Sequence, residues 1–412
     1  MSFVLQMSLW SISFIEIIHD PQPQLITMKE ILSPSFKVGI LGGGQLGKML
    51  GQAASNWHLP LYFLDESRDF PAGVVAAEFV EGNFKNYDDV LAFGQDKDVL
   101  TIEIEHVNTA ALELLQAQGV TVHPHPEALD LIKDKGLQKL FYQEHQLPSS
   151  HFELFEDEHA VRHAVHSGRW LYPFVQKSRT AGYDGKGVAV IKNESDLQHK
   201  LLQGSCLLET MVDIQKELAV IVARNPSGEI AAFPVVEMDF NPEANLVEFL
   251  ICPARIDPVI GQAAIELSKR VIETFGICGL LAVELFLTKD NQILINEVAP
   301  RPHNSGHHTI DSCYTSQFEQ HLRGILNLPL GSTAMKCPSV MVNLLGAEGF
   351  NGPTRYVGLE DCLALPGVKL HFYGKSTTKP YRKMGHATVL AESIEEAVRV
   401  AKMVQEKLSI EC

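Results

Sequence analysis

The stretch "LLAVELFLTKDNQILINEVAP" (residues 280–300) contains two apolar runs on either side of Asp290-Asn291. This pattern predicts two antiparallel strands joined by a turn. A symmetric four-residue loop centred on the dipeptide would place Glu284 directly opposite Glu297, whereas an asymmetric loop would break this pairing. Facing carboxylates repel each other unless a divalent cation with oxygen ligands binds them. The stretch therefore predicts a metal site, with a solvated carboxylate pair on an open sheet face as the alternative.

Polar side chains crowd the segment that follows, "NEVAPRPHNSGHHT" (residues 296–309). A loop of this composition is more typical of a site than of a packing element. A zinc site built from His303, His307 and His308 is an alternative, but Pro302 disfavours the helix that would align His303 with His307. The candidate site residues of this loop are Arg301, His303, Asn304 and Ser305.

A second loop, "TAGYDGKG" (residues 180–187), sets Gly182, Gly185 and Gly187 around an aspartate and a lysine. Glycine permits positive φ and lets backbone N–H groups approach an anion closely, so this loop fits a flap over phosphates. The alternative is a hairpin turn, although tight hairpins use only about two to five residues and this loop is longer.

A third glycine cluster, "GILGGGQLGKML" (residues 39–50), contains G-x-G-x-x-G between an apolar run and a helical pattern. Strands alternate with helices after it, which predicts a doubly wound parallel sheet. Asp65 at the end of the second strand makes a nicotinamide-dependent oxidoreductase an alternative. A lone glycine motif is weak support for that class, which would explain neither the second glycine loop nor the two glutamates.

In the middle and at the end of the chain, short strands and turns replace the regular alternation of strands and helices. Two helices are expected within residues 126–148, a strand at 230–238 after a hairpin turn at 225–228, and a helix from Pro258 to Phe275. The last ~80 residues predict strands around 339–346 and 369–375 and a closing helix at about 393–408. These patterns predict an α/β protein of two or three domains.

Composition excludes several classes of protein. The 412 residues include 34 basic and 50 acidic side chains, a net charge of −16, which disfavours a nucleic-acid partner. Seven cysteines without C-x-x-C spacing predict free thiols in a reducing compartment. Residues 1–27 carry neither the basic start of a signal peptide nor an apolar run long enough for a membrane span, so we expect no membrane partner.

Taken together, the motifs resemble those of the ATP-grasp ligases, and the match is closest to the N5-carboxyaminoimidazole ribonucleotide synthetases. The resemblance runs from about Lys37 onward and is carried by "GILGGGQLGKML", "TAGYDGKG", "INEVAPRPHNSGH", "SQFEQHLRGILNLPLG" and "KPYRKMGH". It implies an ATP- and bicarbonate-dependent carboxylation of 5-aminoimidazole ribonucleotide in purine biosynthesis, with Mg²⁺, in a cytoplasmic homodimer. It also implies an ATP-grasp fold: an extension of unknown role (1–35), a Rossmann-like substrate domain (36–134), a two-part ATP-grasp domain (135–330) with a mobile lid at about 147–213, and a small, mostly-β C-terminal domain (331–412).

The resemblance also implies roles for individual residues. The nucleotide would contact Lys135, Lys177, Asn296 and Glu297, the adenine edge would meet Glu209, Thr210, Met211 and Val212, and Glu217 would hold the ribose. The flap would contribute Gly182, Tyr183, Asp184, Gly185, Lys186, Gly187 and Val188. The substrate would meet Gln45, Leu46, Glu103, Asn304, Ser305, Lys375, Arg382 and Lys383. Glu284 and Glu297 would bind Mg²⁺, and the catalytic set would be Tyr183, Asp184, Lys186, Arg301, His303 and Lys375, with Asp184 managing the amine proton.

The chain departs from the family pattern at two positions. Lys186 stands where many relatives have arginine, so a point charge replaces a bidentate guanidinium. Phe240 stands where a family histidine is expected near the nucleotide, so that contact is not carried over. A formate-dependent glycinamide ribonucleotide transformylase is the alternative within the fold. That branch is expected to have Asp-Thr where this chain has Asn304-Ser305. The Asn-Ser pair therefore favours the bicarbonate-using enzymes.

Overall fold

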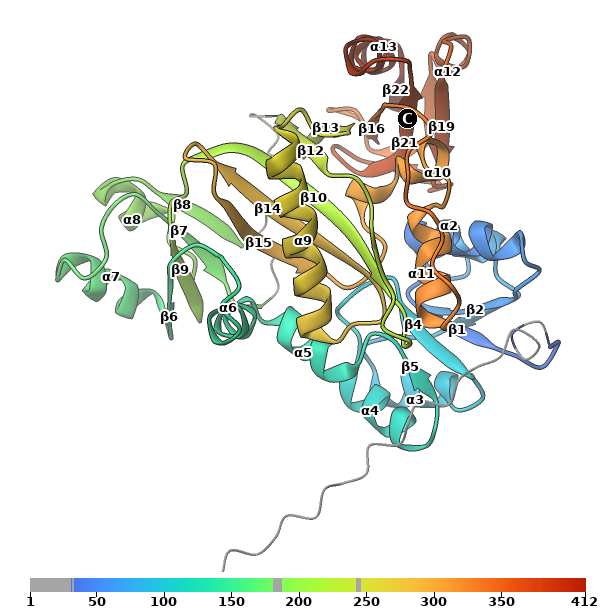
Figure 1. The fold of residues 1–412 in the computed structure, drawn as a ribbon, viewed down its shortest axis with the longest axis horizontal. Coiled ribbons are helices and arrows are strands. Elements are labelled where there is room, and N and C mark those ends of the chain that lie inside the picture. The colour runs from blue at the N-terminus through green and yellow to red at the C-terminus, as the bar shows by residue number, and fades with distance from the viewer. Residues whose placement is uncertain (1–30, 32, 181–186, 242–245) are drawn as a thin grey trace, which may run out of the picture.

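The computed structural model describes residue 31 and residues 33–180, 187–241 and 246–412. The described chain contains a five-stranded, a four-stranded and a nine-stranded sheet, together with two small two-stranded sheets. The four-stranded sheet and the five-stranded sheet lie on different sides of the nine-stranded sheet (Figure 1).

The five-stranded sheet is fully parallel, as the alternation of strands and helices predicts. Its strands lie in the order β3-β2-β1-β4-β5, so the order reverses beside β1 and β4, and ligands of open α/β sheets bind at such a switch point. The elements are β1 (Val38–Leu41), α2 (Gln45–Ser55), β2 (Leu61–Asp65), η1 (Pro71–Val74), β3 (Glu78–Glu81), α3 (Tyr87–Gly94), β4 (Val99–Ile102), α4 (Thr109–Ala117) and β5 (Thr121–Val122).

Two helices then lead into the four-stranded sheet, whose order is β6-β9-β7-β8. Asp134 separates the helices, because its carboxylate accepts hydrogen bonds from the N–H groups of Gly136 and Leu137 and caps the second helix. The elements are α5 (Pro126–Lys133), α6 (Lys135–Glu144), β6 (Phe152–Phe155), α7 (Glu158–His166), β7 (Phe174–Ser178), β8 (Val188–Ile191), α8 (Glu194–His199) and β9 (Cys206–Thr210).

The nine-stranded sheet forms the centre of the molecule and runs β15-β14-β10-β12-β13-β16-β21-β19, with β11 paired to β10. Its last three strands come from the C-terminal part of the chain, so that part continues the central sheet through the pairing of β13 with β16. The elements of its first half are β10 (Ile214–Arg224), β11 (Ile230–Ala232), β12 (Val236–Asn241), β13 (Leu246–Cys252), α9 (Pro258–Phe275), β14 (Gly279–Thr288) and β15 (Ile293–Ala299).

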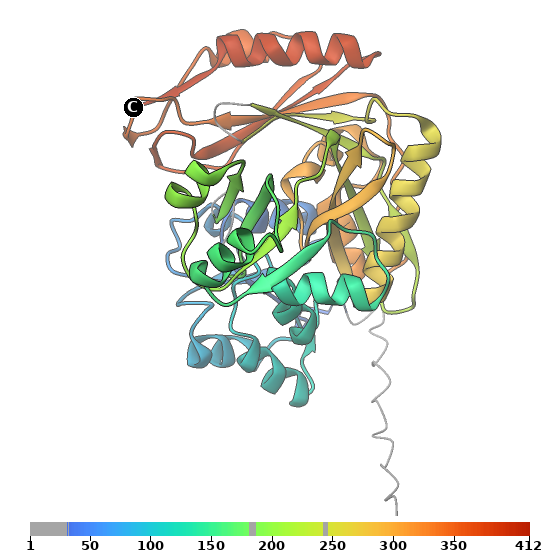
Figure 2. The ribbon, with the colours of Figure 1, turned by 90° about the vertical axis from the view of Figure 1, so that its left-hand side faces the viewer.

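The remaining elements follow the polar loop after β15. Helix α13 covers the C-terminal strands (Figure 2), and its apolar side packs into a core with β16 and β21. The elements are η2 (Asn304–Gly306), α10 (Thr309–Ser312), α11 (Gln317–Ile325), β16 (Ser339–Leu345), β17 (Gly352–Pro353), β18 (Arg355–Val357), α12 (Leu359–Leu363), β19 (Val368–Phe372), β20 (Thr377–Thr378), β21 (Lys383–Leu390), α13 (Ile394–Lys407) and β22 (Ser409–Glu411).

Helix α9 occupies the residues that the sequence predicts. Asp257 caps its first turn, Pro258 starts it, and Gly276 ends it with φ of 65°. Its apolar residues pack with Leu281, Val283 and other odd-numbered residues of β14, so the even-numbered residues of this strand face away from the helix.

One strand prediction is wrong. Residues 230–238 do not form a continuous strand, because β11 ends at Ala232 and β12 begins at Val236. Pro234 lies in the break, and proline cannot donate a backbone hydrogen bond to a ladder.

Among the described residues, no helix has the length and apolarity needed to span a bilayer.

Candidate active site

The β14–β15 hairpin places Glu284 directly opposite Glu297, as the sequence predicts. The predicted four-residue loop is wrong, however: the Thr288 N–H bonds to the Gln292 carbonyl at 2.9 Å, so the loop holds three residues. Asn291 adopts φ of 62°, which suits such a loop. A bulge at Asn296 then shifts the register by one residue and restores the glutamate pair.

The bulge also sets which side chains reach the neighbouring sheet. Asn296 Oδ1 accepts a hydrogen bond of 2.9 Å from Lys177 Nζ, and Glu297 forms an ion pair with Lys135. Lys135 is the first residue of α6 and Lys177 lies near the end of β7. The four predicted residues therefore meet between the central sheet and the four-stranded sheet.

The carboxylates have unequal electrostatic surroundings. Burial, together with the charges of Glu297 and Glu217, raises the pKa of Glu284. Glu217 lies on the same face of the sheet, because its neighbour across the strands is Phe286, two residues from Glu284. Burial also opposes ionisation of Glu297, but Lys135 outweighs it and lowers the pKa of this carboxyl group.

The polar loop after β15 lies against this pair. His303 Nε2 is 3.6 Å from Glu284 Oε1, and its Nδ1 is 2.9 Å from Ser305 Oγ. Ser305 is only 1 % exposed, so its hydroxyl orients the imidazole and has little surface for a ligand. Asn304 exchanges two side-chain hydrogen bonds with Asn343, of 2.9 and 3.1 Å, which fixes its amide.

Arg301 connects the loop to the first sheet through an ion pair of 2.8 Å with Glu105. Its Nε is buried and has no hydrogen-bond partner among the described residues. A buried donor without an acceptor is costly, so Arg301 keeps an unsatisfied nitrogen beside the polar loop.

In the glycine turn of the first sheet, backbone N–H groups are hydrogen-bonded to the carboxylate of Glu103 and are not available to a ligand. The two oxygens of Glu103 accept hydrogen bonds from Gly44 N–H and Gly47 N–H at the start of α2. Asp65 is likewise bound to the N–H of Gly43, at 2.6 Å. A carboxylate therefore occupies the position at which a dinucleotide phosphate would bind, which counts against the oxidoreductase alternative.

The remaining substrate candidates come from two other elements. Gln45 and Leu46 open helix α2 beside the glycine turn, and Leu46 is buried. In the segment between β19 and β21, Lys375 Nζ donates to the Lys383 carbonyl at 2.8 Å and Arg382 donates to the Thr377 carbonyl at 2.7 Å. The ring of His307 in the polar loop lies 4.8 Å from that of His386 in β21, so the start of β21 lies close to this loop.

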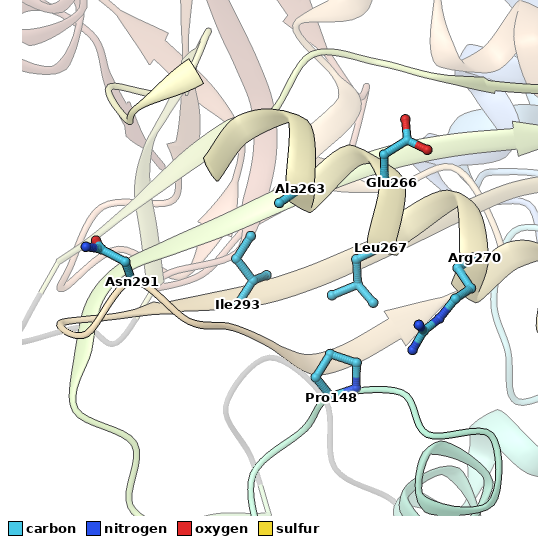
Figure 3. A pocket seen from close by; sticks show the side chains of 7 residues that line it. All are labelled: Pro148, Ala263, Glu266, Leu267, Arg270, Asn291 and Ile293. Carbon is cyan, nitrogen blue, oxygen red and sulfur yellow. The ribbon is translucent and has the colours of Figure 1, made fainter. Parts of the chain in front are cut away.

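A separate groove of about 490 Å³ lies on the other face of the hairpin. Figure 3 shows Ala263 of α9 above Ile293 and Leu267 of the same helix beside it, with Asn291 at the hairpin end. None of the predicted site residues lines it, because the carboxylates face away from α9. The chemistry of the predicted site therefore belongs to the opposite face.

Comparisons with known proteins agree with this geometry. Residues 35–133 match the ribonucleotide synthetase preATP-grasp domain, residues 140–318 the ATP-grasp domain, and residues 339–399 the phosphoribosylaminoimidazole carboxylase C-terminal domain. The crystal structure of N5-carboxyaminoimidazole ribonucleotide synthetase from Thermotoga maritima is 43% identical, with a TM-score of 0.84 over 91% of this chain and 99% of that one. The chain belongs to this family.

Two further relatives extend the comparison. The N5-carboxyaminoimidazole synthase of Aspergillus clavatus, solved in complex with ADP and 5-aminoimidazole ribonucleotide, is 32% identical, with a TM-score of 0.82 over 90% of this chain and 98% of that one. The phosphoribosylaminoimidazole carboxylase of Candida albicans is 40% identical over 88% of this chain. The chain spans 65% of the length of that carboxylase.

Several of the predicted nucleotide contacts stay predictions. Gly182, Tyr183, Asp184, Gly185 and Lys186 lie outside the described residues. Gly187 follows them with φ of 77°, a conformation that favours glycine. Thr210 ends β9 and is exposed, as are Met211 after it and Val188 at the start of β8, so these predicted nucleotide contacts are open to a ligand.

Sequence reasoning did not single out one charged residue beside these positions, and the structure adds a contact to another. Lys139, one helical turn after Lys135, has its Nζ 2.7 Å from Glu209 Oε1. Glu209 was expected at the adenine edge, but its side chain contacts lysines, which leaves only its main chain for a base. The spacing of Lys135 and Lys139 on one helix face was the available signal.

Proposed function

We propose that this chain is an ATP-dependent ligase that carboxylates 5-aminoimidazole ribonucleotide with bicarbonate and releases ADP and phosphate. The observation that carries the proposal is the meeting of Glu284 and Glu297 with Lys135 and Lys177 in a chain of this family. The lysines supply positive charge for a triphosphate, and the carboxylates supply ligands for its metal ion. The activity, its substrates and a cytoplasmic homodimer are parts of this proposal.

The donor set fits Mg²⁺. Magnesium binds in proteins through one or two carboxylates and completes its shell with water and substrate phosphates. Glu284 and Glu297 are such a pair, and the repulsion between them, which raises the pKa of Glu284, is relieved when a cation binds. When bound, Mg²⁺ would neutralise charge on the β- and γ-phosphates.

The reaction proceeds through two bond exchanges. A bicarbonate oxygen attacks the γ-phosphorus of ATP, the bond to ADP breaks, and carboxyphosphate forms. The substrate amine then attacks the carbon of carboxyphosphate or of CO₂ released from it, phosphate leaves, and the amine loses one proton. Phosphate is a far better leaving group than hydroxide, which is why ATP is needed.

The described residues have distinct parts in this scheme. Lys135 and Lys177 stabilise charge on the transferring phosphoryl group. Arg301 would supply positive charge for an anion, and His303, held by Ser305, directs Nε2 towards Glu284. Lys375, Arg382 and Lys383 would bind the phosphate of the ribonucleotide, while Gln45, Leu46 and Glu103 line its other side.

The test mixes the protein with Mg·ATP, bicarbonate and 5-aminoimidazole ribonucleotide and follows ADP release. We expect release that depends on both the ribonucleotide and bicarbonate. A parallel reaction with glycinamide ribonucleotide and formate should remain at background. ADP release that the aminoimidazole ribonucleotide does not stimulate would refute the assignment.

A further inference from the structure

Lys139 is a buried lysine that the proposed chemistry does not use. It is only 2 % exposed, and its Nζ lies 2.7 Å from Glu209 Oε1 and 3.0 Å from Ser150 Oγ. Lysine is almost never fully buried unless it is paired, so a specific role must offset the cost of its position. Its burial also prevents it from touching a nucleotide directly.

Glu209 connects this lysine to the predicted phosphate-binding lysine. Its second oxygen, Oε2, lies 2.8 Å from Lys177 Nζ, and Glu209 itself is 3 % exposed. Burial opposes ionisation of Glu209, but Lys177 and Lys139 outweigh it and lower the pKa of this carboxyl group to about 2. Glu209 is therefore ionised between the two lysines, and the three side chains form a cluster. Burial lowers the pKa of Lys139, and the charge of Glu209 opposes that shift.

The cluster joins three parts of the fold. Lys139 comes from α6, Glu209 and Lys177 come from adjacent strands of the four-stranded sheet, and Lys177 also bonds to Asn296 of the central sheet. The cavity between these residues has a volume of only about 10 Å³, at the lower limit for a single water molecule. Solvent therefore has little room to replace a lost ammonium group.

The charges in the cluster suggest what Lys139 contributes. Two ammonium groups share one carboxylate, which leaves one positive charge in excess. Without Lys139, Glu209 would neutralise Lys177 alone, and the attraction of Lys177 for an anion would weaken.

We propose that Lys139 is a positioning residue that, through Glu209, holds the Lys177 ammonium in place for the triphosphate of ATP and keeps the cluster net positive. This inference rests on the proposed function, because it assumes that Lys177 binds ATP. It goes beyond that function by assigning the affinity for ATP partly to a side chain that no ligand touches.

The experiment measures nucleotide binding by calorimetry, with Mg·ATP and Mg·ADP, in wild type, Lys139→Met, Glu209→Gln and the double variant. Methionine keeps the length of the side chain and removes its charge. We expect Lys139→Met to weaken ATP binding about tenfold, and Mg·ADP binding less, because the lost charge would face the γ-phosphate. The double variant restores the excess positive charge and should recover at least about threefold of that loss.

Lys133→Met is the matched control. Lys133 is a partly buried lysine on the preceding helix, and it is paired with Asp130 at 2.8 Å. Its removal should leave nucleotide affinity unchanged. A role of Lys139 confined to stability would make the double variant bind no better than Lys139→Met.

Three results would overturn the proposal: wild-type affinity in folded Lys139→Met, an equal loss in Lys133→Met, or a double variant that binds no better than the single one. If Lys139→Met does not fold, the double variant, which removes both buried charges, decides alone. It should bind ATP within about threefold of wild type, and a loss of more than about tenfold counts against the proposal. Since binding is measured without the ribonucleotide, failure here is distinct from failure of the carboxylation assay.

Discussion

Glu103 and Glu209 are both buried carboxylates, but the protein accommodates them in different ways. Glu103, 9 % exposed, accepts hydrogen bonds from the backbone of the glycine turn, and burial raises its pKa to about 7. Glu209 lies between two lysines, which lower its pKa to about 2 against the effect of burial. Backbone amides thus compensate only part of the cost of burial, whereas ammonium groups exceed it.

The two regions are therefore suited to different ligands. The glycine turn has a carboxyl group that changes charge near neutral pH, which suits hydrogen bonding to a substrate. In the lysine-rich region around Lys135, Lys139 and Lys177, the pKa values of Glu209 and Glu297 are lowered, so these two carboxylates stay ionised over a wide pH range, which suits a triphosphate. The pKa of Glu284 is raised, and a bound metal ion would lower it. Four substitutions test this contrast.

The largest effect is expected in the lysine-rich region, from Glu297→Gln. The variant removes one metal ligand and the partner of Lys135 with little change in shape. We expect kcat to fall about 10³-fold, or about 4 kcal/mol, while the fold persists. Steady-state ADP release measures it, with Glu266→Gln on the outer side of α9 as the control. Turnover at the wild-type level would remove Glu297 from the metal site.

Glu209→Gln is the next largest change, and its effect is on stability. It leaves two buried lysines without their counter-charge, so the free energy of unfolding should fall by about 3 kcal/mol at pH 7. Because the pKa of Glu209 is depressed to about 2 in the folded state, its stabilisation is present above the unfolded pKa of 4.5 and is lost as pH falls towards 2. Urea unfolding should show the two proteins converging on acidification. If the difference in unfolding free energy stayed constant on acidification, the ionised carboxylate of Glu209 would not be the source of the stabilisation.

In the glycine turn, Gly44→Ala tests whether the carboxylate requires a residue without Cβ. An added Cβ would lie 2.5 Å from Glu103 Oε1, so the carboxylate must move away from the amides that bind it. We expect a loss of about 2 kcal/mol in the free energy of unfolding. Gly204→Ala is the control: its φ is 84° and its Cβ would meet nothing within 4 Å, so only a backbone cost of about 1 kcal/mol is expected. Equal losses would show that contact with Glu103 is unimportant.

Glu103→Gln should have the smallest effect and the opposite dependence on pH. A raised pKa means that the protonated form favours folding, so this contribution is present below 4.5 and is lost as pH rises towards 7. We expect the variant to lose about 1 kcal/mol at pH 5 and to gain on wild type as pH rises. Denaturant melts at several pH values measure the difference. If the difference in unfolding free energy between wild type and variant grew as pH rises, Glu103 would stabilise the fold in its charged form, as Glu209 does, and the prediction would be wrong.

The sequence predicted the β14–β15 hairpin only in part. The facing glutamates are present, but the three-residue loop shifts the pairing by one residue and the bulge at Asn296 shifts it back. Turn length depends on local geometry around Asn291, and bulges have weak local sequence signals. The alternation of residues along the two strands therefore could not predict the loop length or the bulge, whose effects on the register cancel.

Local patterns by themselves determined the parallel first sheet, the limits of α9 and the family to which the chain belongs, because periodicity, caps and glycine spacing are encoded in neighbouring residues. Tertiary structure decided that the C-terminal strands continue the central sheet and that Lys139 and Glu209 meet in a buried cluster with Lys177. These contacts join residues that are far apart in the chain. Their energies depend on burial and on the nearness of opposite charges, which arise only when the whole chain has folded.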